Sequence, residues 1–229
     1  MAFSLNLQDF LIPLLQIIGV NIVLSGDNAV VVALAARSLP PTLQKKAILW
    51  GTVAAVVARI ILTFFAAKIL LLPFLKIIGA GLLCWIGVKF IINDDEKKNI
   101  TSSGNLYAAI KIIVIADVVL SLDNVIAVAA AARGSVPLLC ISLIISIPII
   151  IFGSVATIRL MELFPFIITL GGCLLGWVAG EMALSDSSIN DLVNVHYPTL
   201  LKVIPFFGLL LVLICGSILK KRTNALHKS

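Results

Sequence analysis

Seven stretches of mostly apolar residues, each about 20 residues long, follow one another along this chain and leave it few possible folds. A helix of that length crosses the hydrocarbon core of a bilayer, in which every backbone polar group must be hydrogen-bonded within the protein. We therefore predict an all-α fold, a polytopic membrane protein with seven transmembrane helices. The predicted spans are residues 10–36, 46–70, 73–92, 108–132, 136–157, 164–184 and 200–219.

The composition excludes a separate water-soluble domain. Hydrophobic residues make up 61% of the 229 residues and charged residues only 12%, with a mean hydropathy of +1.17. Soluble domains are about 45–50% apolar and about 25% charged. The four cysteines fall inside predicted spans without CxxC spacing, which indicates neither a disulfide framework nor a thiolate metal site.

The formal net charge of +6 comes from basic residues near the ends of the spans, where membrane proteins keep them, and does not indicate nucleic-acid binding. If seven spans alternate in direction, four basic clusters fall on one side of the membrane. By the positive-inside rule we predict that the N-terminus lies outside and the C-terminus in the cytoplasm. The clusters contain Arg37, Lys45 and Lys46; Lys97 and Lys98; Arg159; and Lys220, Lys221, Arg222 and Lys228.

A polar motif occurs twice inside these apolar stretches. Residues 21–37 read NIVLSGDNAVVVALAAR and residues 117–133 read DVVLSLDNVIAVAAAAR, and ten of the 17 aligned positions are identical. Each copy places an Asp-Asn pair in a run of Val, Leu, Ile and Ala. An ionised carboxylate at the centre of a membrane helix costs about 2.5–3.5 kcal/mol on insertion scales, so a duplicated one indicates a functional site.

A second match extends the repeat to a unit of three spans. Residues 72–85 (LPFLKIIGAGLLCW) resemble residues 164–177 (FPFIITLGGCLLGW). Because three is odd, the second copy must enter the membrane in the opposite direction, which gives the inverted repeats that recur in secondary transporters. The predicted organisation is a first three-helix repeat (1–92), a cytoplasmic linker (93–107), a second three-helix repeat (108–184), and an extracellular loop, seventh helix and cytoplasmic tail (185–229).

The polar residues of each copy follow helical spacing. An Asn or Asp, a Ser and an Asn lie at i, i+4 and i+7 and share one helix face, with a further Asp beside the last Asn. Carboxylate, amide and hydroxyl oxygens are hard ligands that suit Mg²⁺, Ca²⁺ or Mn²⁺, and no His, Cys or Met accompanies them. Inverted repeats would bring the two groups to one midplane site for a divalent cation. The predicted metal ligands are Asp27, Asn28, Asp117, Asp123 and Asn124, and the supporting residues are Asn21, Ser25, Ser121 and Arg59.

Charge balance gives the three aspartates different roles. Asp27 and Asp123 together balance one divalent cation, and Asp117 adds a third negative charge. That charge is neutralised either by a proton or by Arg59, which lies in the middle of the second span as a structural counter-ion or as a gate. The alternative for each aspartate is that it caps a broken helix or pairs with a buried Arg.

The duplicated S-x-D-N motif, followed by an Ala/Val-rich helix and an Arg, resembles the TerC family of integral membrane proteins. The length and the seven-span layout are most similar to the short bacterial branch of that family, and the resemblance covers residues 10–220. It implies a manganese exporter of the bacterial inner membrane, with Mn²⁺ as the transported ion and no tightly bound cofactor. The spacing of the residues by itself indicates only a hard divalent cation.

Alternating access coupled to protons is the leading hypothesis, and two other classes of function stay open. An accessory protein that delivers Mn²⁺ to secreted enzymes would use the same ion path. An intramembrane aspartic protease would use Asp27 and Asp123 as a dyad, but each is followed by Asn in near-identical surroundings, so we expect ion binding and no enzyme. The expected partners are the divalent cation and the lipid bilayer, with no nucleic acid, and a homo-oligomer is compatible with the sequence.

Overall fold

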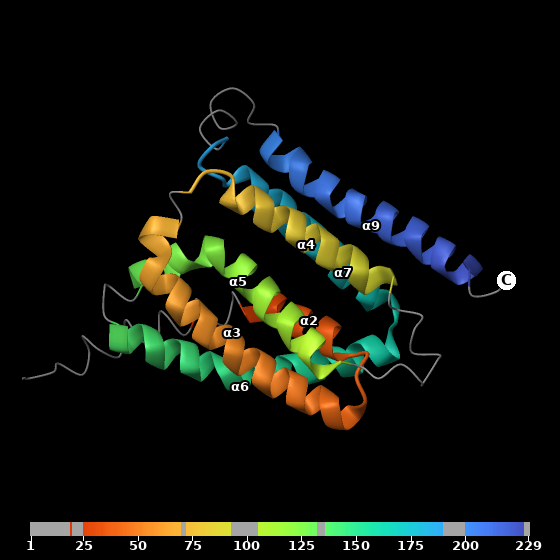
Figure 1. Ribbon diagram of the computed structural model, residues 1–229, viewed down its shortest axis with the longest axis horizontal. Helices are drawn as coiled ribbons and strands as arrows, with labels where there is room; N and C mark the ends of the chain where they lie inside the picture. Colours follow the sequence, from red (N-terminus) through yellow and green to blue (C-terminus); the bar gives the residue numbers. More distant parts are fainter. Residues whose placement is uncertain are drawn as a thin grey trace, which may run out of the picture.

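The computed structural model describes residues 19, 25–69, 72–92, 105–131, 136–189 and 200–226, and the regular structure within these ranges is entirely helical. The predicted all-α fold is therefore confirmed for this part of the chain. Its helices are α2 (Ser25–Ala36), α3 (Pro41–Ile69), α4 (Leu75–Ile92), α5 (Leu106–Ala131), α6 (Val136–Leu163), α7 (Phe166–Leu184) and α9 (Leu200–Leu226) (Figure 1).

Five of these helices, α3, α4, α6, α7 and α9, are long and apolar enough to cross a membrane. α5 has 26 residues, and α2 is a shorter apolar helix within the described part of the chain. The first predicted span lies mostly outside the described residues, since only its last 12 residues belong to α2. The chain is thus a multi-pass integral membrane protein.

Three helices extend beyond the apolar stretches that predicted them. α3 begins at Pro41 and not at residue 46, because proline fits the first turn of a helix, where amide hydrogens have no partner inside the helix. α6 continues to Leu163 and α9 to Leu226, past the predicted ends at residues 157 and 219. Helical hydrogen bonding continues in polar sequence, so the apolar pattern marks the membrane-embedded part of a helix and not its ends.

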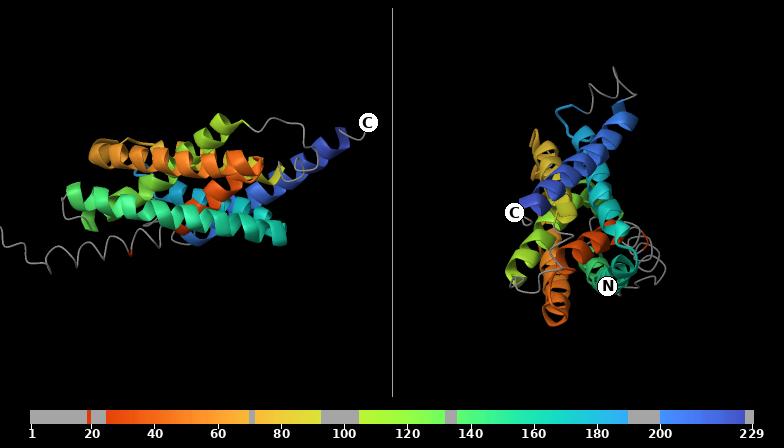
Figure 2. Two further views of the ribbon diagram at one scale, coloured as in Figure 1. Left: turned by 90° about the horizontal axis from the view of Figure 1, so that it is seen from below. Right: turned by 90° about the vertical axis from the view of Figure 1, so that its right-hand side faces the viewer.

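The helices form two groups. α4, α7 and α9 pack against one another, and α2, α3, α5 and α6 make up the second group, which Figure 1 and the right view of Figure 2 separate clearly. α7 approaches its neighbours closely because glycines line its contacts. A Cβ atom at Gly176 would lie 2.5 Å from the carbonyl oxygen of Gly208 in α9, and one at Gly87 in α4 would lie 2.8 Å from that of Gly172. Small residues are what lets membrane helices come this close.

Helices at corresponding places in the two predicted repeats run antiparallel. Gly79 near the start of α4 faces Met182 near the end of α7, whereas Gly87 near the end of α4 faces Gly172 near the start of α7. α3 and α6 lie against each other and run in opposite directions in Figure 1.

The same holds for α2 and α5. Asp27 in the first turn of α2 interacts with Asp117, in the middle of α5, while Leu34 near the end of α2 lies beside Ile112, earlier in α5. Each of the three helix pairs is thus antiparallel, and the motif-bearing α2 and α5 lie side by side.

A carboxylate joins the end of α7 to the start of α4. Asp186 accepts hydrogen bonds from the backbone amides of Phe74 (3.1 Å) and Lys76 (3.0 Å), and Ser188 donates its own amide to it at 2.9 Å. Phe74 has a φ of 62°, in the left-handed region. Burial by itself would raise the pKa of Asp186, but the hydrogen bonds from Ser188, Phe74 and Lys76 outweigh it and lower the pKa below its usual value.

Candidate ion site between α2, α3 and α5

A buried ion pair joins α3 to α5. Nη2 of Arg59 donates to Oδ1 of Asp117 at 2.5 Å, and the two side chains are only 5% and 8% exposed. The two helices meet closely one to two turns before this pair, where Gly51 of α3 fits against Ile113 of α5. Asp117 was expected to be neutralised either by a proton or by Arg59, and the structure pairs it with Arg59.

The hydrogen bonding of this pair is incomplete. Oδ2 of Asp117 and Nε of Arg59 are buried and have no hydrogen-bond partner among the described residues. A guanidinium and a carboxylate commonly form two parallel hydrogen bonds, and a buried pair needs further bonds to offset its desolvation. The pair therefore keeps bonding capacity that a purely structural ion pair would use.

Two hydroxyl groups continue the line of buried polar atoms. Ser121 lies one helical turn after Asp117 on α5, and Thr52 lies two turns before Arg59 on α3. Both residues are at most 1% exposed, and neither hydroxyl forms a hydrogen bond within the described part of the protein. Oγ of Ser121 is near enough to stabilise the charge of Asp117, although its geometry falls short of a hydrogen bond.

Asp27 completes a group of three charged side chains from three helices. It lies half-buried in the first turn of α2, and its Oδ1 accepts the backbone amide of Asn28 at 2.9 Å. The charge of Asp27 interacts with both Arg59 and Asp117. Asn28 is 2% exposed.

The other predicted ligands lie partly or wholly outside the description. Asp123 and Asn124 belong to α5 and Ser25 begins α2, but their side chains are outside the described part, and Asn21 lies outside it altogether. Among the side chains that are described, no three of His, Cys, Asp or Glu stand close enough to hold a metal ion. The structure thus brings Asp27, Arg59, Asp117 and Ser121 together, with Asn28 bonded to Asp27 through its backbone amide, and the contribution of the second Asp-Asn pair stays a prediction.

Thr52 is the residue that the sequence patterns missed. A single threonine in an apolar span gives no signal until a charged residue is known to lie on the same face, and Thr52 is seven residues before Arg59. Three serines of α6 are also buried, but Ser146 and Ser154 donate to carbonyls of their own helix at 2.6 Å. The spacing of these serines along α6 is the sequence signal that could have predicted their burial, because α6 packs against α2.

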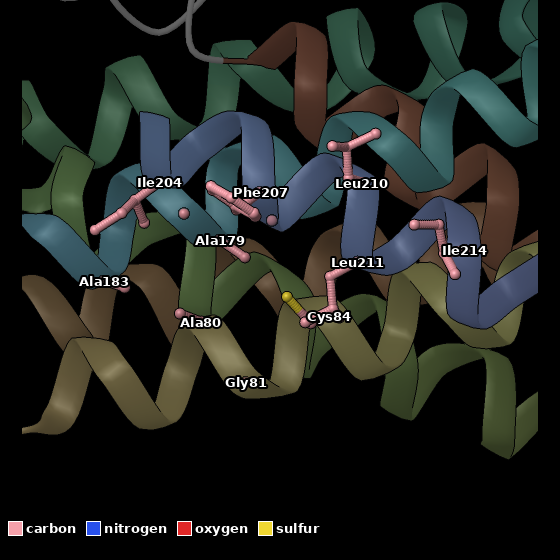
Figure 3. Close-up of a pocket in the computed structure, with 12 residues that line it drawn as sticks. Ala80, Gly81, Cys84, Ala179, Ala183, Ile204, Phe207, Leu210, Leu211 and Ile214 are labelled. Atoms are coloured by element: carbon pink, nitrogen blue, oxygen red, sulfur yellow. The ribbon is translucent and has the colours of Figure 1, made fainter. Parts of the chain in front are cut away.

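A cavity between α4, α7 and α9 differs from this polar group in the chemistry of its lining. It has a volume of about 390 Å³ and is open to the exterior, and its lining is apolar, with Ala80, Cys84, Phe207 and Leu211 among the residues drawn in Figure 3. None of its lining residues is charged. This groove therefore offers no ligands to an ion, and the polar group at α2, α3 and α5 is the candidate site.

Known proteins are similar in sequence to this chain over most of its length. The integral membrane protein TerC family matches residues 6–224. The uncharacterized membrane protein YjbE of Bacillus subtilis (strain 168) is 42% identical over 189 residues, which are 82% of this chain and 87% of that protein. The uncharacterized membrane protein YkoY of the same strain is 24% identical over 206 residues, 80% of this chain and 64% of that protein. No solved structure matches.

Proposed function

Because the chain belongs to the TerC family of integral membrane proteins, we propose that it is a secondary transporter that exports a divalent cation, and not an enzyme. The observation that carries the proposal is the group formed by Asp27, Arg59 and Asp117, three ionisable side chains on three helices of an apolar bundle. Ionisable residues within membrane helices are rare and mark ion pathways.

The charges of the site suit one divalent cation. Arg59 neutralises Asp117, which leaves Asp27 and, in the second copy of the motif, Asp123 to balance two positive charges. Amide and hydroxyl oxygens beside these carboxylates would complete a shell of hard ligands. Among the hard divalent cations we propose Mn²⁺, on the resemblance of the duplicated motif to the TerC family.

We propose that the ion crosses by alternating access at a site where two inverted three-helix repeats meet. The antiparallel course of the matched helices supports this arrangement, as does the position of the site between α2 and α5, where the halves meet. Secondary transporters bind their substrates at such an interface. We further propose that a proton replaces the metal on an aspartate when the metal leaves, which couples export to proton uptake.

We propose the bacterial inner membrane as the location, with the C-terminus in the cytoplasm. The start of α3 and the ends of α4, α6 and α9 lie at the same end of the bundle in Figure 1. These helix ends carry Lys45, Lys89, Arg159 and Lys220. By the positive-inside rule, that end faces the cytoplasm.

Flux of radioactive Mn²⁺ into proteoliposomes tests the proposal. Asp27→Asn and Asp123→Asn are each expected to lower the initial rate at least about tenfold, since even the loss of an outer-shell partner costs about 10–100-fold in metal affinity. Glu181→Gln is the matched control, because this carboxylate is exposed on α7 and bonded to Trp177, away from the site. Unchanged flux in both aspartate variants would contradict the proposed site.

A further inference from the structure

We propose that Arg59 is a tethered cation that occupies one end of the ion site while no metal is bound, and that the arriving divalent cation displaces its guanidinium from Asp117. The inference rests on the proposed function, because it concerns how the transported ion gains access to its ligands. It makes Arg59 a competitor that sets the affinity of the site, in addition to a counter-ion that balances its charge.

The incomplete bonding of the ion pair is the first observation behind this inference. A single described contact, from Nη2 of Arg59 to Oδ1 of Asp117, holds the two groups together, while Nε and Oδ2 are buried and have no partner among the described residues. Unsatisfied polar groups are costly at low dielectric, so a pair kept only for stability would be expected to satisfy them. A pair that must open during each transport cycle would instead be held by few hydrogen bonds, so that it separates easily.

The second observation is the set of oxygens that the guanidinium keeps from a metal. When Arg59 leaves, both oxygens of Asp117 become available, with the hydroxyl of Ser121, which has no hydrogen bond in the described part of the chain, one turn further along α5. Asp27 on α2 interacts with the charges of Arg59 and Asp117 and so adds a second carboxylate to this group of charges. These are hard ligands of the kind a divalent cation replaces its water with.

The third observation is a buried polar group in the direction that the displaced guanidinium would take. Thr52 lies seven residues before Arg59 on the same face of α3, and its buried hydroxyl forms no hydrogen bond within the described structure. Helical side chains lean toward the start of their helix, so Arg59 can extend in the direction of Thr52. The displaced guanidinium would thus turn toward this hydroxyl with metal bound, and toward Asp117 without it.

Equilibrium binding of Mn²⁺ to the purified full-length protein, followed by the electron paramagnetic resonance signal of free Mn²⁺, tests the inference. Arg59→Gln is expected to bind Mn²⁺ at least about tenfold more tightly than wild type, which corresponds to about 1.4 kcal/mol, because both the competitor and its repulsion of the metal are gone. The same variant should transport more slowly in proteoliposomes, since the returning guanidinium no longer helps to release the bound ion. A merely structural role of Arg59 would weaken binding and not strengthen it.

Further variants keep the test decisive. If Arg59→Gln does not fold, Arg59→Lys replaces it: an ammonium is a point charge without the planar fork, so it is displaced more easily and Mn²⁺ should bind more tightly than to wild type. Asp117→Asn should bind Mn²⁺ less tightly than wild type, because a ligand is lost. Mn²⁺ binding to the Arg59 variants that is equal to or weaker than wild type overturns the tethered cation and leaves the transporter standing. Absence of Mn²⁺ binding and flux in the wild-type protein overturns both proposals.

Discussion

The buried charges of Arg59 and Asp117 depend on each other, because the carboxylate bonds to a single guanidinium nitrogen. Each charge is tolerated in the bundle because the other is present, and removal of one partner of a buried pair leaves an uncompensated charge. The pair should therefore respond to single and double substitution in different ways.

We expect Asp117→Asn to lower the free energy of unfolding by about 3–5 kcal/mol, since it leaves the charge of Arg59 unpaired. The double variant Arg59→Gln with Asp117→Asn should recover most of this loss, because two neutral amides can bond to each other. Thermal unfolding temperatures of wild type, Asp117→Asn, Arg59→Gln and the double variant in one detergent measure both effects. A double variant no more stable than Asp117→Asn would argue against the pair as the cause.

Thr52 should show a trade between stability and function. Thr52→Val removes a buried hydroxyl that has no hydrogen bond and keeps the shape of the side chain, so we expect stability to stay the same or rise by about 1 kcal/mol. Transport should fall if the hydroxyl receives the displaced Arg59. Ser154→Ala is the control, since it removes a hydroxyl that donates to the carbonyl of Ile150. A Thr52→Val protein with lower stability and full transport would contradict this expectation.

At the scale of single residues, charge arithmetic predicted more than spacing did. The sequence shows three aspartates against one arginine inside the spans, and this imbalance made Arg59 a candidate partner of Asp117. It does not show which helix faces meet, so the choice between proton and arginine needed the structure. Thr52 escaped because a lone threonine acquires meaning only from the partner on a neighbouring helix.

At the scale of helices, the hydrogen bonds of Asp186 to the start of α4 predict that the stability of the fold depends on pH. The pKa of Asp186 in the folded protein lies below the ordinary value of about 3.9. Its carboxylate therefore stabilises the fold above that pH, and the contribution is lost as the pH falls through the lower folded-state pKa.

Asp186→Asn should lower the free energy of unfolding by about 1 kcal/mol at neutral pH, as the loss of a helix cap does. Between pH 5 and pH 3, about the range in which an aspartate titrates, wild type should lose thermal stability more steeply than the variant does. Melting curves at several pH values measure the difference. Parallel curves for the two proteins would show that Asp186 is not the titrating group.

The close approach of α7 to α9 gives a second prediction for the elements. Gly176→Ala should destabilise the protein, because its Cβ would lie 2.5 Å from a backbone oxygen of Gly208 that cannot move aside. Gly81→Ala in α4 is the matched control: its Cβ would meet nothing within 4 Å, and alanine favours a helix over glycine by about 1 kcal/mol. If the two variants melt at the same temperature, the contact is looser than the structure has it.

The positions of the helices could be predicted because long apolar runs have few alternatives in a bilayer. Their ends could not, as α3 and α9 show, because helices continue into polar sequence without an apolar signal. The sequence match between residues 72–85 and 164–177 predicted that α4 and α7 correspond. Their direct contact through Gly87 and Gly172 follows from backbone shape, which the pattern of residues does not express.

For the whole molecule, the two groups of helices do not coincide with the two halves of the sequence. α2 and α3 come from the first half and α5 and α6 from the second, yet these four form one group, while α4 and α7 join α9 in the other. The halves are therefore interlaced, and they cannot rock past each other as separate lobes. Any rocking must occur between two mixed bodies, with hinges in the short connections from α3 to α4 and from α6 to α7, where Phe74 already has an unusual backbone angle.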